Sequence, residues 1–432
     1  MIKIITLFCF LVTALTVNAK NLEVDITISK NNASSQWVIN YNFSENITAI
    51  SFENTPYSFI KSDWSSRTDN AILDLSSLQV NFNKDARNFL LNLKGENDQF
   101  IRGFYTPFLN FSDGSNAIYI GHYLPSKVKV GEVWVDIADI TLALTITASK
   151  SDNVLYAGLN EVKNLNISIP STRQYAYIGN LVNNTHEKFN IILDPKLPSW
   201  IQTAYLKAIP EFYNYYETTT LAKLSFSPLF IVNFKPGSMQ PRLDGGAINK
   251  QIAINIVGDG WQQNPESNLN NVLSLLAHEM AHLWNNQHWK LANNTQIWMQ
   301  EGGANYFARN ALLNFKYISN EEYIEHFKKQ AGKCIKALNE QSVDKLQSRS
   351  DVYICGEVFY QLSASMIGAT NNLDIWNKIV NNQATLNYSE NDFIQALNKA
   401  NVNKIDIAAI ENILYGINKN ELSRLIEKYT GE

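Results

Sequence analysis

The stretch Asn268–Trp284, NLNNVLSLLAHEMAHLW, constrains the fold most, because it predicts a helix that is apolar on nearly every side. Such a helix is stable only where other elements surround it, so we expect it at the centre of a domain. Two histidines interrupt the apolar surface. His278 and His282 stand four residues apart, which places them one turn from each other on the same face of the helix.

This spacing is typical of a metal site. Two imidazoles one helical turn apart can bind one cation without backbone strain. Glu279 follows the first histidine, so its carboxylate is expected beside such a cation, where a general base for an activated water stands. The alternative is an accidental H-E-x-x-H match, because the motif is short. A buried carboxylate with no cation nearby would be costly or forced to protonate, which favours the metal site.

A catalytic zinc ion normally takes three protein ligands and leaves one position for water. Glu301 is the third candidate, since 18 residues separate it from His282, enough to end one helix and return a second alongside. Thr295 can cap this second helix. Gly302 and Gly303 follow Glu301 although glycine disfavours a helix by about 1 kcal/mol relative to alanine, so we expect another backbone to approach here. Taken alone, Glu301 could also be a solvated helix glutamate.

These motifs resemble the gluzincin metallopeptidases, in particular the aminopeptidase N and leukotriene hydrolase family. That family reads H-E-x-x-H-x-W and then, with eighteen residues between it and the second histidine, a glutamate in W-x-x-E-G-x-A-x-Y. The chain matches this pattern at His278, Glu279, His282, Trp284, Trp298, Glu301, Gly302, Ala304 and Tyr306. The resemblance implies that the two histidines and Glu301 bind one zinc ion per chain and that Glu279 is the general base.

The family also carries a tyrosine in a Y-x-K-G stretch that stabilises the oxyanion of the tetrahedral intermediate. Here VYICGEVFY places Tyr353 before Gly356, with Cys355 where lysine is usual. A phenol hydroxyl donates a hydrogen bond where negative charge develops, so the resemblance implies a catalytic role for Tyr353. The alternatives are a tyrosine that only packs on a helix, and Tyr360 as the oxyanion donor.

One element of the aminopeptidase pattern is missing. Family members read G-x-M-E-N upstream of the zinc helix, where the glutamate binds the substrate's free amine, and the related glycyl aminopeptidase family reads G-G-L-E-H. This chain reads GGAIN at Gly245–Asn249, so Ile248 stands at the position of the anchoring glutamate. An apolar side chain cannot hold an ammonium ion, although a strand edge can still bind a peptide through its backbone.

The resemblance therefore implies zinc-dependent hydrolysis of peptide bonds in a peptide or protein substrate, of the aminopeptidase type. Two alternatives stay open. One is a zinc endopeptidase that does not depend on a free N-terminus, and the other is a catalytically weak peptide-binding protein that retains zinc. Asn305, one turn past Glu301, could orient a metal ligand or be an ordinary surface amide.

The pattern of the chain changes near residue 190. Residues 20–190 alternate apolar and polar positions, as in LEVDITIS (Leu22–Ser29) and VWVDIADITLALTITAS (Val133–Ser149), which predicts a β-rich, sandwich-like N-terminal domain. In residues 191–432 a helix and the strands Leu224–Phe234 and Gly245–Gly258 precede an almost wholly helical stretch. This predicts an α+β domain with a small sheet and a helical C-terminal lobe, which the resemblance implies is thermolysin-like.

Charge and the N-terminus bound the remaining possibilities. A formal charge of −4 and a pI of about 5.9 argue against nucleic acid as a partner. Lys3 followed by the apolar run Ile4–Val17 predicts a signal peptide, residues 1–19, cleaved after Ala19, and hence an exported, periplasmic or secreted protein with no stable membrane insertion. The alternative is an uncleaved anchor, although spanning a bilayer takes about 20 residues.

After removal of the signal, Cys334 and Cys355 are the cysteines that remain. Two cysteines in an exported protein can form one disulfide, but the sequence does not show whether the pair is close enough to bridge. A disulfide and two buried thiols are therefore both open. The sequence carries no signal for a particular oligomeric state.

Overall fold

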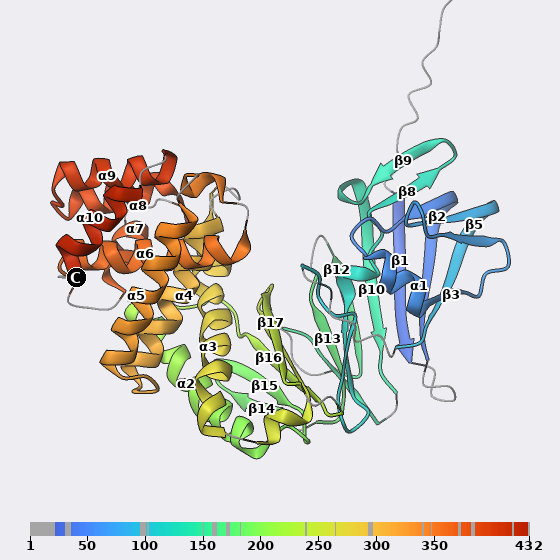
Figure 1. The fold of residues 1–432 in the computed structure, drawn as a ribbon. Coiled ribbons are helices and arrows are strands. Elements are labelled where there is room, and N and C mark those ends of the chain that lie inside the picture. The colour runs from blue at the N-terminus through green and yellow to red at the C-terminus, as the bar shows by residue number, and fades with distance from the viewer. Residues whose placement is uncertain are drawn as a thin grey trace, which may run out of the picture. The chain divides into compact units, whose positions relative to one another are not determined.

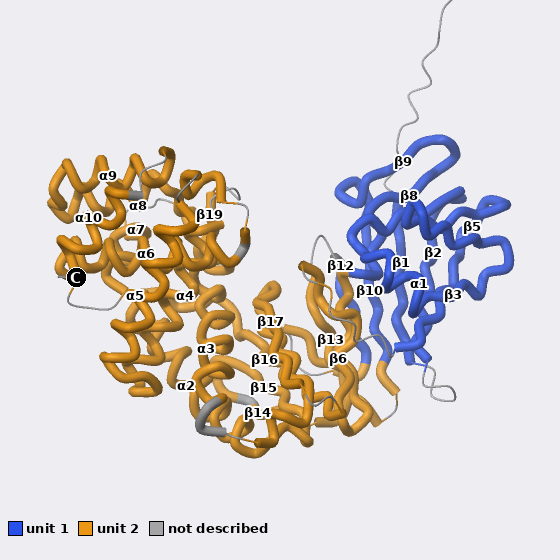
Figure 2. The backbone as a smooth tube through the Cα atoms, viewed as in Figure 1, with its two compact units in different colours: residues 1–95, 122–147, 164–171 blue, residues 96–121, 148–163, 172–432 orange. Residues whose placement is uncertain are grey.

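A computed structural model describes residues 22–30, 36–95, 101, 103–149, 151–157, 162–169, 173–181, 183–237, 240–263, 265–292, 297–338, 341–346, 348–369, 373–381, 385–416 and 419–430. The predicted signal peptide and Thr295 lie outside these residues. Across the described ranges, no helix combines the length and the apolar character needed to cross a membrane. The chain separates into two compact units, which are described in turn (Figure 2): residues 1–95, 122–147 and 164–171, and residues 96–121, 148–163 and 172–432.

Unit 1 is β-rich, as the alternation predicts. Its strands join one nine-stranded sheet in which β1 pairs with β10 in parallel and with β2 in antiparallel orientation. Apolar residues of β1 from Leu22 to Ile28 are buried while Glu23 and Asp25 between them are exposed. The elements are β1 (Leu22–Lys30), β2 (Trp37–Ser51), α1 (Tyr57–Asp63), β3 (Trp64–Ser66), β4 (Ala71–Asp74), β5 (Gln79–Leu93), β8 (Lys127–Val130), β9 (Val133–Asp136), β10 (Ile140–Thr147) and β12 (Asn164–Ile169).

The predicted strand Val133–Ser149 is interrupted. β9 ends at Asp136, whose carboxylate accepts a hydrogen bond from the Ala138 amide at 3.1 Å and caps a single 3₁₀ turn. β10 then begins at Ile140. The alternation predicted the two strands, but a side chain that bonds its own backbone two residues on is a local turn signal that alternation does not include.

Among its described residues, unit 2 contains three further sheets and the helices from α2 onwards (Figure 1). A four-stranded sheet has the order β11-β13-β7-β6, a five-stranded sheet has the order β14-β15-β16-β18-β17, and β19 and β20 form a two-stranded sheet. The strands are β6 (Phe108–Asn110), β7 (Asn116–Tyr119), β11 (Asn153–Leu155), β13 (Tyr175–Gly179), β14 (Asn184–His186), β15 (Phe189–Leu193), β16 (Leu229–Lys235), β17 (Arg242–Ile248), β18 (Gln251–Val257), β19 (Lys290–Leu291) and β20 (Asn387–Tyr388).

Unit 2 includes residues 96–121 and 148–163, which lie before the change of pattern near residue 190. They belong to unit 2 because the four-stranded sheet packs on one face of the five-stranded sheet. Buried side chains from both sheets form one core, in which Tyr175 and Tyr177 of β13 meet Leu229 and Ile231 of β16. Period-two alternation predicted these strands as β-structure but could not assign them to one sheet or another, since it reports which residues are buried and not what buries them.

The C-terminal part of unit 2 is almost wholly helical, as the sequence predicts. The Ser319 hydroxyl accepts a hydrogen bond from the Glu322 amide, and the Glu322 carboxylate accepts one from the Ser319 amide, which forms a capping box at the start of α5. The helices are α2 (Ser199–Thr219), α3 (Pro265–His282), the π-helical turn η4 (Leu283–His288), α4 (Ile297–Asn314), α5 (Asn320–Ala337), α6 (Arg349–Met366), α7 (Asp374–Val380), α8 (Glu390–Lys399), α9 (Lys404–Tyr415) and α10 (Lys419–Thr430).

The predicted strand Gly245–Gly258 is a hairpin. β17 and β18 pair in antiparallel orientation up to Ile248 and Gln251, and the two residues between them, Asn249 and Lys250, have φ angles of 23° and 67°. Two positive φ angles suit a tight hairpin turn. Because this turn lacks the glycine that usually indicates a hairpin, the sequence pattern predicted one continuous strand. The turn leaves β17 at the edge of the sheet.

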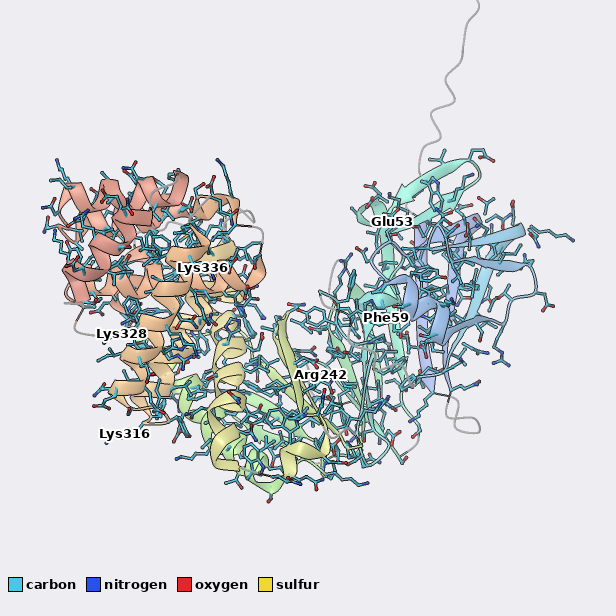
Figure 3. The ribbon with its side chains drawn as sticks, in the orientation of Figure 1. Glu53, Phe59, Arg242, Lys316, Lys328 and Lys336 are labelled. Carbon is cyan, nitrogen blue, oxygen red and sulfur yellow. A yellow bond between two sulfur atoms is a disulfide. The ribbon has the colours of Figure 1, made fainter. Side chains whose placement is uncertain are left out.

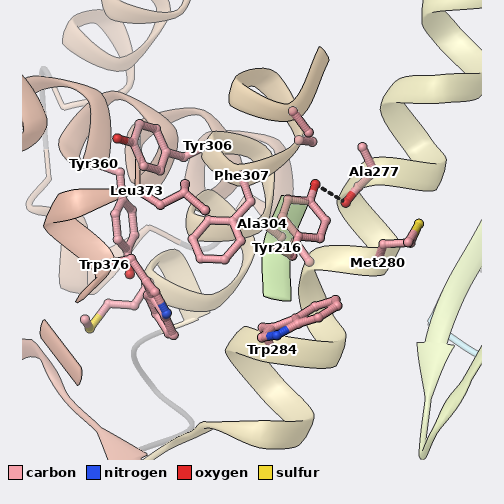
Figure 4. Close-up of a cluster of buried hydrophobic side chains, with 14 of the residues drawn as sticks. Tyr216, Ala277, Met280, Trp284, Ala304, Tyr306, Phe307, Tyr360, Leu373 and Trp376 are labelled. Atoms are coloured by element: carbon pink, nitrogen blue, oxygen red, sulfur yellow. Dashed lines mark hydrogen bonds between the residues drawn. The ribbon is translucent and has the colours of Figure 1, made fainter. Parts of the chain in front are cut away.

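The helix with the two histidines lies at the centre of unit 2, as its apolar surface predicts. Figure 4 shows a cluster of aromatic side chains from α2, α4, α6 and α7 on one side of it, and the Tyr216 hydroxyl donates a hydrogen bond to the Ala277 carbonyl oxygen at 2.9 Å. Trp284, just past the second histidine, is fully buried and packs edge-on against Tyr216. Lys316, Lys328 and Lys336, labelled in Figure 3, are exposed.

Candidate active site

α3 and α4 bring the predicted metal ligands together. His278 and His282 leave α3 one turn apart, and Glu301 comes from the first turns of α4, which packs beside α3. The two imidazole Nε2 atoms are 3.2 Å apart, and each lies 3.3 Å from Oε2 of Glu301. Around tetrahedral zinc, bonds of about 2.0–2.1 Å separate neighbouring ligand atoms by about 3.3–3.4 Å. The three atoms are therefore spaced as zinc ligands are.

The hydrogen bonds of the two imidazoles fit a cation at this point. Nδ1 of His278 lies 2.8 Å from Oδ1 of Asn305, and Nδ1 of His282 lies 3.0 Å from Oδ1 of Asn285. The Asn285 amide nitrogen donates to the Gln300 carbonyl oxygen at 2.7 Å, which fixes the orientation of this amide. An amide oxygen beside Nδ1 requires a proton there, so Nε2 of the neutral ring presents a lone pair to the other ligand atoms.

Electrostatics also favour positive charge between the three side chains. Oε2 of Glu301 is buried, and no donor in the described part of the chain meets it with hydrogen-bond geometry. Burial opposes the charged form of this carboxyl, but the two histidines hold its pKa well below the ordinary value. Burial alone would lower the pKa of His282, yet the Glu301 carboxylate raises it to about 9. A protonated imidazole supplies the positive charge in the absence of a metal, and a divalent cation would supply it more fully.

Glu279 and Tyr353 line the same cleft as the three candidate ligands. Glu279 is 7% exposed, and the Tyr353 ring stacks on the His278 ring with centroids 5.6 Å apart and an interplanar angle of 12°. Tyr360, the other candidate for an oxyanion donor, is fully buried, stacks on Tyr306 and is absent from the described lining of the cleft. Position therefore favours Tyr353 over Tyr360.

Two glycines hold the helices of the site in backbone contact. A Cβ atom on Gly302 would lie 2.3 Å from the Cα atom of Gly356, and one on Gly356 would lie 2.2 Å from the Trp298 carbonyl oxygen. No side chain fits at either position, which confirms the close approach that the glycines after Glu301 predict. This contact fixes α4, which carries Glu301, against α6, which carries Tyr353.

A disulfide fastens α6 on its other side. Cys334 of α5 and Cys355 of α6 are bonded, with Cα atoms 5.0 Å apart, and both residues are fully buried. The structure thereby decides between the two possibilities that the sequence left open. The half-cystine at position 355 is two residues from Tyr353, so the bond restrains the segment of α6 that lines the cleft.

The cleft has a volume of about 1140 Å³. One side, here called the helical wall, is formed by α3, α4 and α6, and the other, the strand wall, is formed by β17 from Asp244 to Ala247. Ile248 is 5% exposed and packs in the core with Leu229 and Ile231. The position at which the resemblance places an amine-binding carboxylate is thus apolar and turned away from the cleft.

Asn285 is a site residue that the sequence analysis missed. It is completely buried in η4, contacts His282 and the residue before Glu301, and accepts a hydrogen bond from the Tyr388 hydroxyl through its backbone oxygen at 2.6 Å. An asparagine three residues past a histidine lies on the same helical face, which is the signal that could have indicated it. Asn305, by contrast, was one of the candidates: its contact with His278 agrees with the first of the two possibilities that the sequence left open, an amide that orients a metal ligand.

Comparisons with known proteins bear on the fold. No protein-family model matches the chain, and no curated protein matches it. Among solved structures, it is similar to the crystal structure of an aminopeptidase N family protein from Idiomarina loihiensis, with a TM-score of 0.65 and 12% sequence identity. The similarity covers 94% of this chain and 78% of that chain. The α+β fold with a β-rich N-terminal part and a helical C-terminal part is thereby confirmed.

Proposed function

We propose that the chain is a zinc-dependent peptidase, of the aminopeptidase type, that acts on peptides or proteins. The observation that carries this proposal is the spacing of three acceptor atoms, 3.2–3.3 Å apart, beside a buried glutamate in a large cleft. His278, His282 and Glu301 would hold the metal. A zinc ion there would act as a Lewis acid and lower the pKa of a water molecule at its open position.

Glu279 is the general base in this proposal. Its carboxylate takes a proton from the attacking water and passes it to the leaving amine, so the same group acts as base and then as acid. Because Glu279 is almost completely buried, little bulk water competes for the proton.

Tyr353 stabilises negative charge on the substrate. Its hydroxyl donates a hydrogen bond to the carbonyl oxygen as that oxygen becomes an oxyanion, and a donor of this kind contributes most when it is held in place beforehand. The stack on His278 and the nearby disulfide restrain the ring and its helix. The strand wall binds the peptide itself, because the outer edge of β17 can pair with an extended backbone.

The test is hydrolysis of a mixed peptide library by the purified protein, with and without a chelator. We expect cleavage that the chelator abolishes and that added zinc restores. Cleavage that persists without metal contradicts the proposal, and so does a zinc-loaded protein that cleaves nothing. The latter result would support the weakly active, zinc-retaining binding protein.

A second candidate is an endopeptidase, and the burial of Ile248 favours it because no carboxylate stands at that position to hold a terminal amine. Peptides with free and acetylated N-termini distinguish the two. An aminopeptidase cleaves only the free peptides, whereas an endopeptidase cleaves both.

We also propose that the protein is exported, as its first 19 residues indicate. A buried disulfide is compatible with an oxidising compartment. N-terminal sequencing of the protein from its native source tests this, and we expect a mature chain that begins at Lys20.

A further inference from the structure

Among the described residues that line the cleft, three carry carboxylates: Asp244, Glu279 and Glu301. The proposed function uses the last two and leaves Asp244 without a role. Asp244 lies on the strand wall, opposite Asn255 of β18 in the hairpin register. Its side chain is 18% exposed, so the carboxylate has lost most of its contact with water.

The hydrogen bonds of Asp244 fall on one oxygen. Oδ2 accepts from Nε of Arg242 at 3.0 Å and from the Asn255 amide at 3.5 Å, while no donor from the described part of the chain bonds to Oδ1. Burial raises the pKa of Asp244, and the ion pair with Arg242 offsets this only partly. The Arg242 side chain is 42% exposed, so water screens the pair. A second cation at Oδ1 would therefore be favourable.

Aromatic rings complete this corner of the cleft. The side chain missing from Gly246 would meet the Tyr105 ring at 2.7 Å, and alternation along β17 places the Asp244 side chain on the same face of the strand. Tyr105 and Tyr175 both line the cleft and their rings pack edge to face, 6.5 Å apart. Carboxylates and aromatic faces both attract cations.

The corner and the candidate metal centre line the same cleft. On the other face of β17, a Cβ atom on Gly245, the neighbour of Asp244, would lie 3.4 Å from the side chain of Leu275 in α3, three residues before the first candidate zinc ligand. Ile248, where the resemblance places an anchoring carboxylate, is on the same face of β17 as Asp244 but buried in the core. Asp244 is thus the acidic group that this strand presents to the cleft.

We propose that this acidic corner binds a protonated nitrogen of the substrate peptide, and we define the corner by Asp244, Asn255, Tyr105 and Tyr175. The nitrogen belongs either to the terminal ammonium group or to a lysine or arginine side chain. The inference rests on the proposed function and adds a substrate class to it: peptides with a positive charge near the cleaved bond.

Peptide pairs test the inference through a ratio. One pair differs in a free or acetylated N-terminus, and a second differs in lysine or norleucine scanned through each position of an acetylated peptide. We expect the wild type to prefer a cationic peptide over its neutral counterpart by about tenfold in kcat/KM, as a charged hydrogen bond gives, and D244N to prefer it by less than about twofold. The pair that shows the preference identifies the source of the charge.

The control is E217Q, which removes a carboxylate of similar exposure, 15%, from an ion pair with Lys188 outside the cleft. It should keep the wild-type ratio. An unchanged ratio in D244N, or no preference in the wild type, overturns the inference while peptide cleavage still supports the proposed function.

A measurement of peptide binding tests the acidic corner even if the protein cleaves no peptide. Calorimetry on E279Q and on E279Q/D244N, both loaded with zinc, should show about tenfold weaker binding of the preferred cationic peptide when Asp244 is replaced. Equal affinity in the two variants rejects the acidic corner.

Discussion

The two walls of the cleft are built in different ways. In the helical wall, backbone contact between Gly302 and Gly356, a disulfide and two amide–histidine hydrogen bonds restrain the groups that the chemistry needs. The strand wall is an edge strand with two glycines, partly exposed to solvent and paired on one side only. We infer that the proposed reacting groups are held in place by packed elements, whereas the proposed substrate-binding strand is restrained on one side only.

The largest effect is expected from E279Q, which keeps the shape of the side chain but cannot accept a proton. Turnover should fall by about 10²–10⁴-fold, the range that general acid–base groups contribute, while zinc content stays at the wild-type value. Steady-state kinetics and elemental analysis measure the two quantities. E325Q, on the exposed face of α5, is the matched control and should behave as the wild type. Retained turnover in E279Q would remove Glu279 from the mechanism.

Y353F tests the other catalytic group of the helical wall. Loss of one oxyanion donor lowers kcat by about 10²–10³-fold, and KM should change little because the hydrogen bond strengthens only as charge develops. Y57F replaces an exposed tyrosine of unit 1 and should leave both constants unchanged. A large rise in KM with normal kcat would instead make Tyr353 a binding residue.

N285A tests whether the hydrogen bonds that Asn285 makes to His282 and to the backbone before Glu301 contribute to zinc affinity. Removing the amide frees the His282 ring and the backbone before Glu301, so zinc affinity should fall by about 10–100-fold, as it does when the partners of metal-bound histidines are lost. Competition with a chromogenic chelator measures this affinity without reference to activity. N271A removes an exposed amide from α3, the helix that carries His282, and should bind zinc normally. Equal affinities in the two variants would show that Asn285 serves only to pack.

The smallest effect on the chemistry is expected from C334A/C355A. The bond closes a loop between residues 21 apart in the sequence, and its loss should lower the free energy of unfolding by about 3 kcal/mol. Denaturant unfolding measures the loss, and the zinc content of the folded variant should be unchanged. If the variant unfolds at the same denaturant concentration as the wild type, the disulfide does not stabilise the helical wall.

The helical wall could be predicted from the sequence more fully than the strand wall, and the reason is physical. The spacing of His278 and His282 fixes their relative position because helix geometry is local. The glycines after Glu301 indicate a close backbone contact, because glycine is otherwise unfavourable inside a helix. The capping box at Ser319 is equally local. Each of these signals requires only a few neighbouring residues.

The strand wall and its neighbours depend on distant pairing. Asn249 and Lys250 form a tight turn without glycine, so the hairpin looked like one strand. Asp244 can be recognised as part of a binding corner only in the folded structure, where Tyr105, which is distant in the sequence, lies beside the same strand. The grouping of residues 96–121 and 148–163 with the second unit likewise depends on which sheet buries them, which alternation does not encode.

Anomalous diffraction at the zinc absorption edge, from crystals of the wild-type protein, tests the central claim most directly. We predict one strong peak per chain, about 2.0–2.1 Å from Nε2 of His278, Nε2 of His282 and an oxygen of Glu301. A zinc peak at another position only, or no peak between these three side chains in protein crystallised with zinc, would contradict it.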